Sequence, residues 1–165
     1  MSIGRFYAGI AAVIRSSQTN QYLLLRRSDQ KDYGPGVWEC VTGRVDQGEG
    51  YDDAFQREVQ EELGVAVKVE YILGTTHFYR GAPTPENELV GVVYLCSLNE
   101  PGSVTIGPEH SEFRWFAVEE AIELLSATDP STQWARRVIE RAEIIRTILP
   151  SKLVKLNQQT GFELG

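Results

Sequence analysis

The sequence has few cysteines, no long apolar run and no excess of basic residues. Its 165 residues include two cysteines, which excludes the dense disulfide framework of many small secreted domains. Cys40 and Cys96 both lie inside apolar runs. We therefore predict two buried, reduced thiols rather than a disulfide between them.

The scarcity of basic residues also restricts the partners. A net charge of −7 argues against duplex nucleic acid or an anionic membrane surface. No apolar run is long enough to cross a bilayer, and the N-terminus lacks a basic segment followed by a hydrophobic region. These absences predict a cytoplasmic protein. A small phosphorylated substrate stays compatible with the charge, because a metal ion would offset its phosphates.

Strand and helix patterns are interleaved along the chain and predict an α/β fold. The chain is long enough for one domain with a substantial core, and we place that domain at residues 1–150, followed by a tail or pairing segment at 151–165. Interleaved strands and helices imply a mixed sheet with helices on both faces. The expected strands are 6–15, 22–26, 37–41, 65–69, 71–79, 89–98 and 113–118, and helices are expected up to Gly64, over 119–126 and over 131–149.

The segment from Gly43 to Val65 begins as a glycine-punctuated loop and continues as an acidic helix. Helical spacing puts Glu58, Glu61 and Glu62 on one face within two turns. The adjoining apolar stripe, predicted to be buried, consists of Phe55, Val59 and Leu63. Like charges at this spacing repel each other unless a cation lies between them. The alternatives are a solvated acidic face or a site for Mg²⁺ or Mn²⁺, which prefer oxygen ligands.

The upstream residues favour the metal site. The whole segment fits the pattern G-x5-E-x7-R-E-U-x-E-E-x-G-U, where U is aliphatic, without a mismatch. This pattern is that of the Nudix hydrolases, and the chain resembles them. The resemblance implies an α/β/α sandwich with a mixed sheet. It also implies Mg²⁺-dependent cleavage of a diphosphate linkage in a nucleoside diphosphate joined to another group. Many Nudix proteins are dimers, so a homodimer is expected.

The resemblance also implies roles for individual residues. Glu58 and Glu62 are expected to bind the metal, with Glu61 beside them or holding a water. The backbone carbonyl of Thr42 would complete the site. Glu49, in the loop, is expected to be a further ligand or an orienting group, and Arg57 to position Glu58 by ion pairing. Glu109 matches by position a glutamate that many members supply from a later loop as a ligand or base. Glu112 is the alternative, and a surface role is open for either one.

The sequence indicates the type of reaction more clearly than it indicates the substrate. Arg26, Arg27, Arg80 and His110 are candidates to bind phosphate, while a surface or structural role is open for each. Tyr33, Trp38, Phe78 and Tyr79 are candidates to stack a base or pterin, or to pack in the core; for Trp134 we predict a core position.

One departure from the family pattern concerns the strand before the motif. Many Nudix proteins carry Pro-Gly-Gly there, whereas this chain has Val41-Thr42-Gly43. The segment from Trp38 to Gly43 resembles dihydroneopterin triphosphate pyrophosphatases. It favours a nucleoside or pterin triphosphate that releases pyrophosphate. The alternatives are an ADP-ribose or dinucleoside polyphosphate substrate, or a catalytically silent nucleotide-binding module.

Overall fold

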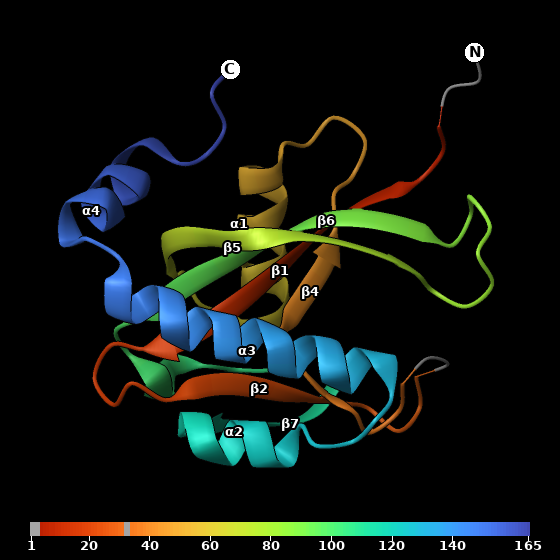
Figure 1. Ribbon diagram of the computed structural model, residues 1–165, viewed down its shortest axis with the longest axis horizontal. Coiled ribbons are helices and arrows are strands. Elements are labelled where there is room, and N and C mark those ends of the chain that lie inside the picture. Colours follow the sequence, from red (N-terminus) through yellow and green to blue (C-terminus); the bar gives the residue numbers. More distant parts are fainter. Residues whose placement is uncertain (1–3, 32–33) are drawn as a thin grey trace.

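The structure is a computed structural model that describes residues 4–31 and 34–165. Seven strands form one sheet, and helices lie on both of its faces (Figure 1). The strands are β1 (Tyr7–Ser16), β2 (Tyr22–Arg27), β3 (Trp38–Glu39), β4 (Val41–Arg44), β5 (Lys68–Tyr79), β6 (Glu88–Leu98) and β7 (His110–Phe116). The helices are α1 (Tyr51–Leu63), α2 (Val118–Leu124), α3 (Pro130–Ile148), α4 (Ser151–Thr160) and the short 3₁₀ turn η1 (Pro101–Ser103).

The sheet is mixed, as predicted. Its main order is β3-β2-β1-β6-β5, with β4 also paired to β1 and β7 paired to β2. β1 and β6 run parallel over their whole length, and the other pairs are antiparallel. The predicted hairpin between the first two strands pairs at Arg15 and Tyr22. Further along, β1 pairs with β4 instead, which brings the residues before α1 to the middle of the sheet.

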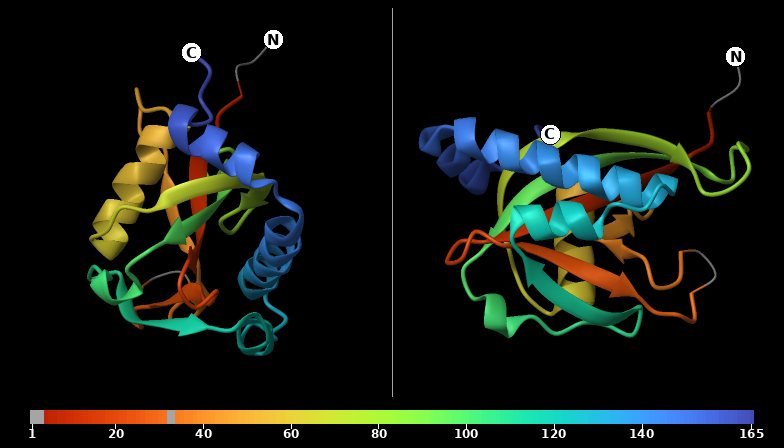
Figure 2. Two further views of the ribbon diagram at one scale, coloured as in Figure 1. Left: turned by 90° about the vertical axis from the view of Figure 1, so that its left-hand side faces the viewer. Right: turned by 60° about the horizontal axis from the view of Figure 1, so that its bottom comes forward.

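Alternation along β1 explains the two hydrophobic layers. Ile10, Ala12 and Ile14 belong to the core cluster that contains α1, whereas Ala11 and Val13 belong to the cluster that contains α2 and α3. Successive side chains of a strand point to opposite faces, so one apolar strand contributes to both layers. Figure 2 shows α1 and α3 on opposite sides of the strands. The predicted α/β/α sandwich is confirmed.

Helix α1 has the apolar stripe expected from its sequence. Phe55, Val59 and Leu63 are all buried against the sheet. The helix ends at Gly64, whose positive φ of 64° gives the left-handed cap that glycine adopts without strain. The packing of this apolar stripe therefore also fixes the direction of the adjoining face of α1, which carries the carboxylates.

Several elements differ from the expected ones. The third expected strand is divided into β3 and β4, and the fourth and fifth are the single strand β5 with two shifts in its pairing to β6. Residues 151–165, expected as a tail, contain α4, which packs on β5. The buried Asn157 donates a 2.9 Å hydrogen bond from Nδ2 to the carbonyl oxygen of Glu70. The apolar pattern of this segment is too weak to predict a helix. Part of the helix is held in place by polar contacts, which periodicity does not reveal.

The thiol prediction is confirmed. Cys40 and Cys96 are buried and free, and burial raises the pKa of Cys40 to about 12 and that of Cys96 well above its usual value. Neither thiol is a nucleophile in this environment. Among the described residues, no helix is long and apolar enough to cross a membrane.

Candidate functional site

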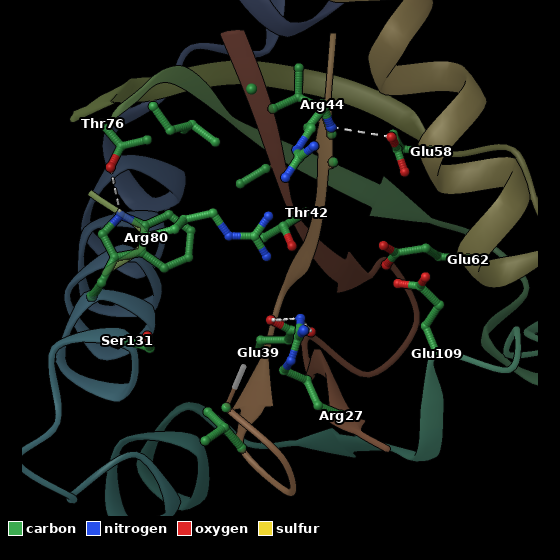
Figure 3. Close-up of a pocket in the computed structure, with 18 of the residues that line it drawn as sticks. Arg27, Glu39, Thr42, Arg44, Glu58, Glu62, Thr76, Arg80, Glu109 and Ser131 are labelled. Carbon is green, nitrogen blue, oxygen red and sulfur yellow. Dashed lines mark hydrogen bonds and ion pairs between the residues drawn. The ribbon is translucent and has the colours of Figure 1, made fainter. Parts of the chain in front are cut away.

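A cavity of about 820 Å³ opens between α1, the middle of the sheet and the start of α3. Its walls differ in charge (Figure 3). The acidic wall carries Glu39, Glu58, Glu61, Glu62 and Glu109. Arg80 extends into the cavity from the side that faces Glu58 and Glu62, whereas Arg27 lies beside Glu39 (Figure 3). The cavity is also lined by Arg137 and by the aromatic residues Trp38, Phe78, Tyr79 and Trp134. An anionic ligand would therefore be held by cationic side chains and would need a cation between itself and the carboxylates.

Arg57 organises the loop that precedes α1. Its Nε and Nη2 atoms donate to the two carboxylate oxygens of Glu49, at 2.7 and 2.8 Å. Its Nη1 donates to Glu58 Oε1 at 2.9 Å, and Nη2 also reaches the carbonyl oxygen of Arg44 at 2.9 Å. These hydrogen bonds lower the pKa of Glu49 to about 2. One guanidinium thus connects loop and helix, and neither Arg57 nor Glu49 lines the cavity.

Glu58 is held close to the strand before the loop. The backbone N–H of Arg44 donates to Glu58 Oε1 at 3.2 Å. A Cβ atom on Gly43 would lie 2.0 Å from Glu58 Cδ, so only glycine leaves room for this carboxylate. Thr42 precedes it in β4 and lines the cavity (Figure 3). The family's usual Pro-Gly-Gly is thus replaced by a paired strand, while the glycine beside the carboxylate is kept.

Unlike Glu58, Glu62 has a buried carboxylate oxygen, Oε2, with no hydrogen-bond partner among the described residues. Burial, and then the neighbouring carboxylates of Glu39, Glu58 and Glu109, raise the pKa of Glu62 to about 9. Figure 3 shows Glu62 and Glu109 turned toward one another from α1 and from the loop before β7. Without a cation, Glu62 keeps its proton at neutral pH.

Glu39 is a site residue that the sequence did not identify. It accepts two hydrogen bonds from Arg27 Nη1, at 2.9 and 3.3 Å, and lies 3.1 Å from His110 Nε2. The one feature of the sequence that could have identified Glu39 is a single carboxylate between Trp38 and Cys40 in an otherwise apolar run. Its importance depends on the pairing of β3 with β2, which brings it beside Arg27 and near Glu62.

His110 lies in a different place from the one expected. It is the first residue of β7 rather than part of a loop, and its side chain is 2% exposed. Its Nδ1 atom has no partner among the described residues, although the residue lines the cavity. His77, on β5, is exposed and lies 2.9 Å from Glu88 Oε1.

The structure separates the two downstream carboxylates. Glu109 lines the cavity, and Lys31 Nζ lies 2.6 Å from its Oε1, which lowers the pKa of Glu109. Glu112 pairs with Arg114 and is not among the cavity-lining residues. Of the two alternatives, Glu109 is the one at the site.

The candidate phosphate-binding arginines are also separated. Arg27 and Arg80 line the cavity, and Arg80 extends into it from the loop after β5 (Figure 3). Arg26 does not line it, because its side chain turns to Asp29 Oδ1 at 3.2 Å and toward Ser111. Adjacent residues of a strand point to opposite faces, which accounts for the difference.

Three of the four candidate stacking residues line the cavity: Trp38, Phe78 and Tyr79. The fourth, Tyr33, lies outside the described residues. Trp134 packs against the core as predicted, and it also borders the cavity, where its Nε1 donates to Thr76 Oγ1 at 3.1 Å.

The acidic wall has the donor chemistry of a site for a hard divalent cation. All its donors are oxygens, Glu62 Oε2 is buried with no hydrogen-bond partner among the described residues, and burial together with the neighbouring carboxylates raises the pKa of Glu62. In the part of the chain described, no three His, Cys, Asp or Glu side chains converge into a closed metal site. The reason is that Glu58 turns to Arg57 and Glu109 turns to Lys31. The residues fit such an ion, and its binding would require Glu62 to ionise.

Comparison with known families decides the classification. The NUDIX domain profile matches residues 6–142. The chain belongs to the NUDIX family. The Nudix motif, the fold and the position of the acidic helix all agree with this assignment. The family assignment predicted from the sequence is confirmed.

Individual relatives are more distant. Nudix hydrolase 6 of Arabidopsis thaliana is 28% identical over 117 residues, which are 69% of this chain and 40% of that protein. Nucleoside triphosphatase NudI of Escherichia fergusonii is 29% identical over 101 residues, covering 57% of this chain and 71% of NudI. Several curated relatives are much longer, and the chain spans 40% of their length or less.

The solved structure of the E. coli dihydroneopterin triphosphate pyrophosphohydrolase has the same fold. It superposes with a TM-score of 0.64 at 22% identity, covering 83% of this chain and 96% of that one. At 22% identity, this similarity establishes a shared fold and nothing about the substrate.

Proposed function

We propose that this NUDIX protein is a Mg²⁺-dependent pyrophosphohydrolase that cleaves a nucleoside triphosphate or a related pterin triphosphate and releases pyrophosphate. Mn²⁺ would substitute for Mg²⁺. The observation that carries the proposal is the buried Glu62, whose Oε2 atom has no hydrogen-bond partner among the described residues and which lies among other carboxylates in a cavity that basic side chains also line. The similarity to nucleoside triphosphatase NudI supports the triphosphate class.

The negative charge of a phosphoanhydride repels nucleophiles, so catalysis consists mainly of charge neutralisation, positioning and supply of a nucleophilic water. A bound Mg²⁺ supplies Lewis-acid stabilisation of the diphosphate oxygens and acidifies a water. In the proposed site, that ion would be held by the carboxylates of Glu58, Glu61 and Glu62 and by the Thr42 carbonyl. Glu49 acts through Arg57, since both of its oxygens accept hydrogen bonds from that guanidinium.

The remaining cavity residues have roles toward the substrate. Arg27 and Arg80 bind phosphate oxygens. Glu39 holds the guanidinium of Arg27 in place, and His110 in turn contacts the carboxylate of Glu39. Glu109, kept ionised by Lys31, orients the water or accepts its proton. Trp38, Phe78, Tyr79 and Trp134 surround the part of the substrate that carries the base or pterin.

The test is a substrate panel with Mg²⁺ in which phosphate, pyrophosphate and monophosphate are measured separately. Triphosphates should yield pyrophosphate and a monophosphate, and chelation of the metal should abolish both products. Turnover restricted to ADP-ribose or dinucleoside polyphosphates, without pyrophosphate, would contradict the substrate class. Tight nucleotide binding without any turnover across the panel would instead identify a catalytically silent binding module.

A further inference from the structure

The N-terminus of α1 lacks a capping side chain of its own. Its N-cap residue is Gly50, and no side-chain hydrogen bond caps the helix at that position. The first backbone N–H groups of a helix have no partner within the helix. Here the N–H of Tyr51 donates to Glu163 Oε1 at 3.0 Å, although the two residues are 112 positions apart. The negative charge of Glu163 also suits the positive end of the helix dipole.

Helix α1 holds Glu163 in return. Asp52 Oδ2 accepts hydrogen bonds from the backbone N–H groups of Phe162 and Glu163, at 2.8 and 3.3 Å. Its other oxygen, Oδ1, accepts from the hydroxyl of Tyr94 at 3.1 Å. The contact is therefore reciprocal: residues of α1 bind the backbone of 162–163, and a side chain of that segment binds the backbone of α1.

The segment is placed for this contact by its own packing. The Phe162 ring lies with its centroid 5.8 Å from that of Tyr94 and contacts the core. Gly161, at a φ of 67°, turns the chain after α4, and a Cβ atom there would lie 2.5 Å from Asp52 Oδ2. A Cβ atom on Gly50 would lie 2.1 Å from Glu163 Oε2. Two glycines, one on each side, thus leave space for the two carboxylates.

Contacts lead from Glu163 to the proposed catalytic site. The residue before Gly50 is Glu49, whose carboxylate binds Arg57, and Arg57 in turn binds Glu58 Oε1 at 2.9 Å. Glu163 therefore fixes the backbone at Tyr51, where the loop enters α1, two residues after Glu49, the first member of these ion pairs. Residues 161–163 lie outside the range matched by the NUDIX profile, which ends at residue 142.

We propose that residues 161–163 form a clamp, and that Glu163 is a positioning residue for the carboxylates of α1. The inference rests on the proposed function, because it assigns the clamp an effect on Mg²⁺ binding. Glu163 does not line the cavity and makes no contact with the carboxylates of α1 that do. It acts by holding Tyr51, and through it the loop that carries Glu49.

The test compares three variants of the full chain: Glu163→Ala, Glu163→Gln and Glu120→Ala. The amide oxygen of glutamine still accepts the Tyr51 hydrogen bond, so Glu163→Gln is the conservative variant. Glu120 is the matched control, because its Oε2 accepts the N–H of Ala117 at the start of α2, at 2.9 Å and away from the cavity. Mg²⁺ affinity is measured by calorimetry, pyrophosphate release by kinetics, and backbone amide hydrogen exchange over residues 43–58.

Glu163→Ala should weaken Mg²⁺ binding about fivefold, the effect of a lost helix cap, and speed exchange at Tyr51 and in the loop. Glu163→Gln should recover most of the affinity, and Glu120→Ala should leave Mg²⁺ affinity and loop exchange unchanged. Equal Mg²⁺ affinities for Glu163→Ala and Glu120→Ala would overturn the inference. If the unaltered chain binds no Mg²⁺ and releases no pyrophosphate, the proposed function fails. Loop exchange in Glu163→Ala then still decides whether the clamp exists.

Discussion

Glu49, in the loop before α1, and Glu62, near the end of α1, are 13 positions apart in the same acidic segment, and their pKa values are shifted in opposite directions. Hydrogen bonds from Arg57 lower the pKa of Glu49 to about 2. Burial and three neighbouring carboxylates raise the pKa of Glu62 to about 9. Arg57 pairs with Glu49, whereas no cationic side chain of the described residues pairs with Glu62, and the nearby charge of Arg27 offsets only part of the rise in its pKa. The difference underlies our proposal that the Arg57 side is structural and that the Glu62 side binds a cation from solution.

The largest expected effect is that of Glu62→Gln. Glutamine has the same size and no charge, so it removes the carboxylate without leaving a cavity. We expect turnover to fall about a thousandfold, as when one central electrostatic group is removed from an active site. The thermal midpoint of the metal-free protein near pH 7 should change little, because Glu62 is already protonated and uncharged there. Unchanged activity would refute the assignment of the site.

Arg57→Ala should have the next largest effect. It leaves Glu49 and Glu58 without their shared guanidinium and frees the loop, so turnover should fall about a hundredfold through misplaced ligands. Unlike Glu62→Gln, it should also lower the thermal midpoint. Arg57→Lys is the matched comparison, because lysine keeps the charge but not the two-pronged contact with Glu49. Full activity in the alanine variant would show that the Arg57 side does not position the Glu62 side.

The pH dependence of stability should have opposite signs at the two carboxylates. Glu62 releases its proton near pH 4.5 when unfolded and near pH 9 when folded. The folded state therefore binds the extra proton between these values, and the free energy of unfolding falls as pH rises, by at most about 1.4 kcal/mol per pH unit. Glu49 contributes stability above about pH 4.5 that is lost as pH falls toward 2.

Urea unfolding of the metal-free chain from pH 5 to 9 measures the Glu62 effect. Glu62→Gln should flatten the decline, and Mg²⁺ should oppose it, since the ion favours the ionised carboxylate. A decline that is identical in the Glu62→Gln variant would assign it to other groups.

The smallest effect distinguishes the two adjacent arginines. Arg27→Ala should raise KM several-fold, because Arg27 lines the cavity and pairs with Glu39. Arg26→Ala should change KM less than twofold, since Arg26 turns to Asp29 at the surface. Steady-state kinetics with a nucleoside triphosphate measures both. Equal increases would mean that the substrate reaches both faces of β2.

Local spacing explains which parts of the site could be predicted. Glu58 and Glu62 share a helix, so one-dimensional periodicity placed them together and put Phe55 on the buried side. Glu39 lies on another strand, and its proximity to Glu62 depends on strand pairing that no local pattern encodes. The choice between Glu109 and Glu112 also required three dimensions, because Lys31 and Arg114 decide which way each carboxylate turns.

Elements of the fold also differ in how far local sequence determines them. Strands β1 and β6 were predictable from the sequence, because most of their residues are apolar and a run of apolar residues predicts a buried strand. Helix α4 and the 161–163 segment were not, because polar contacts from Asn157, Glu163 and Asp52 hold them in place. Such contacts follow from tertiary structure rather than from periodicity.

The central claim is that the Glu62 side is completed by a divalent cation. Calorimetric titration of the metal-free chain with Mg²⁺ near pH 7, in buffers of different ionisation enthalpy, tests it directly. We predict binding accompanied by release of about one proton, because Glu62 must ionise, and loss of that proton release in Glu62→Gln. Binding without proton release, or with the same affinity in the variant, would contradict the account.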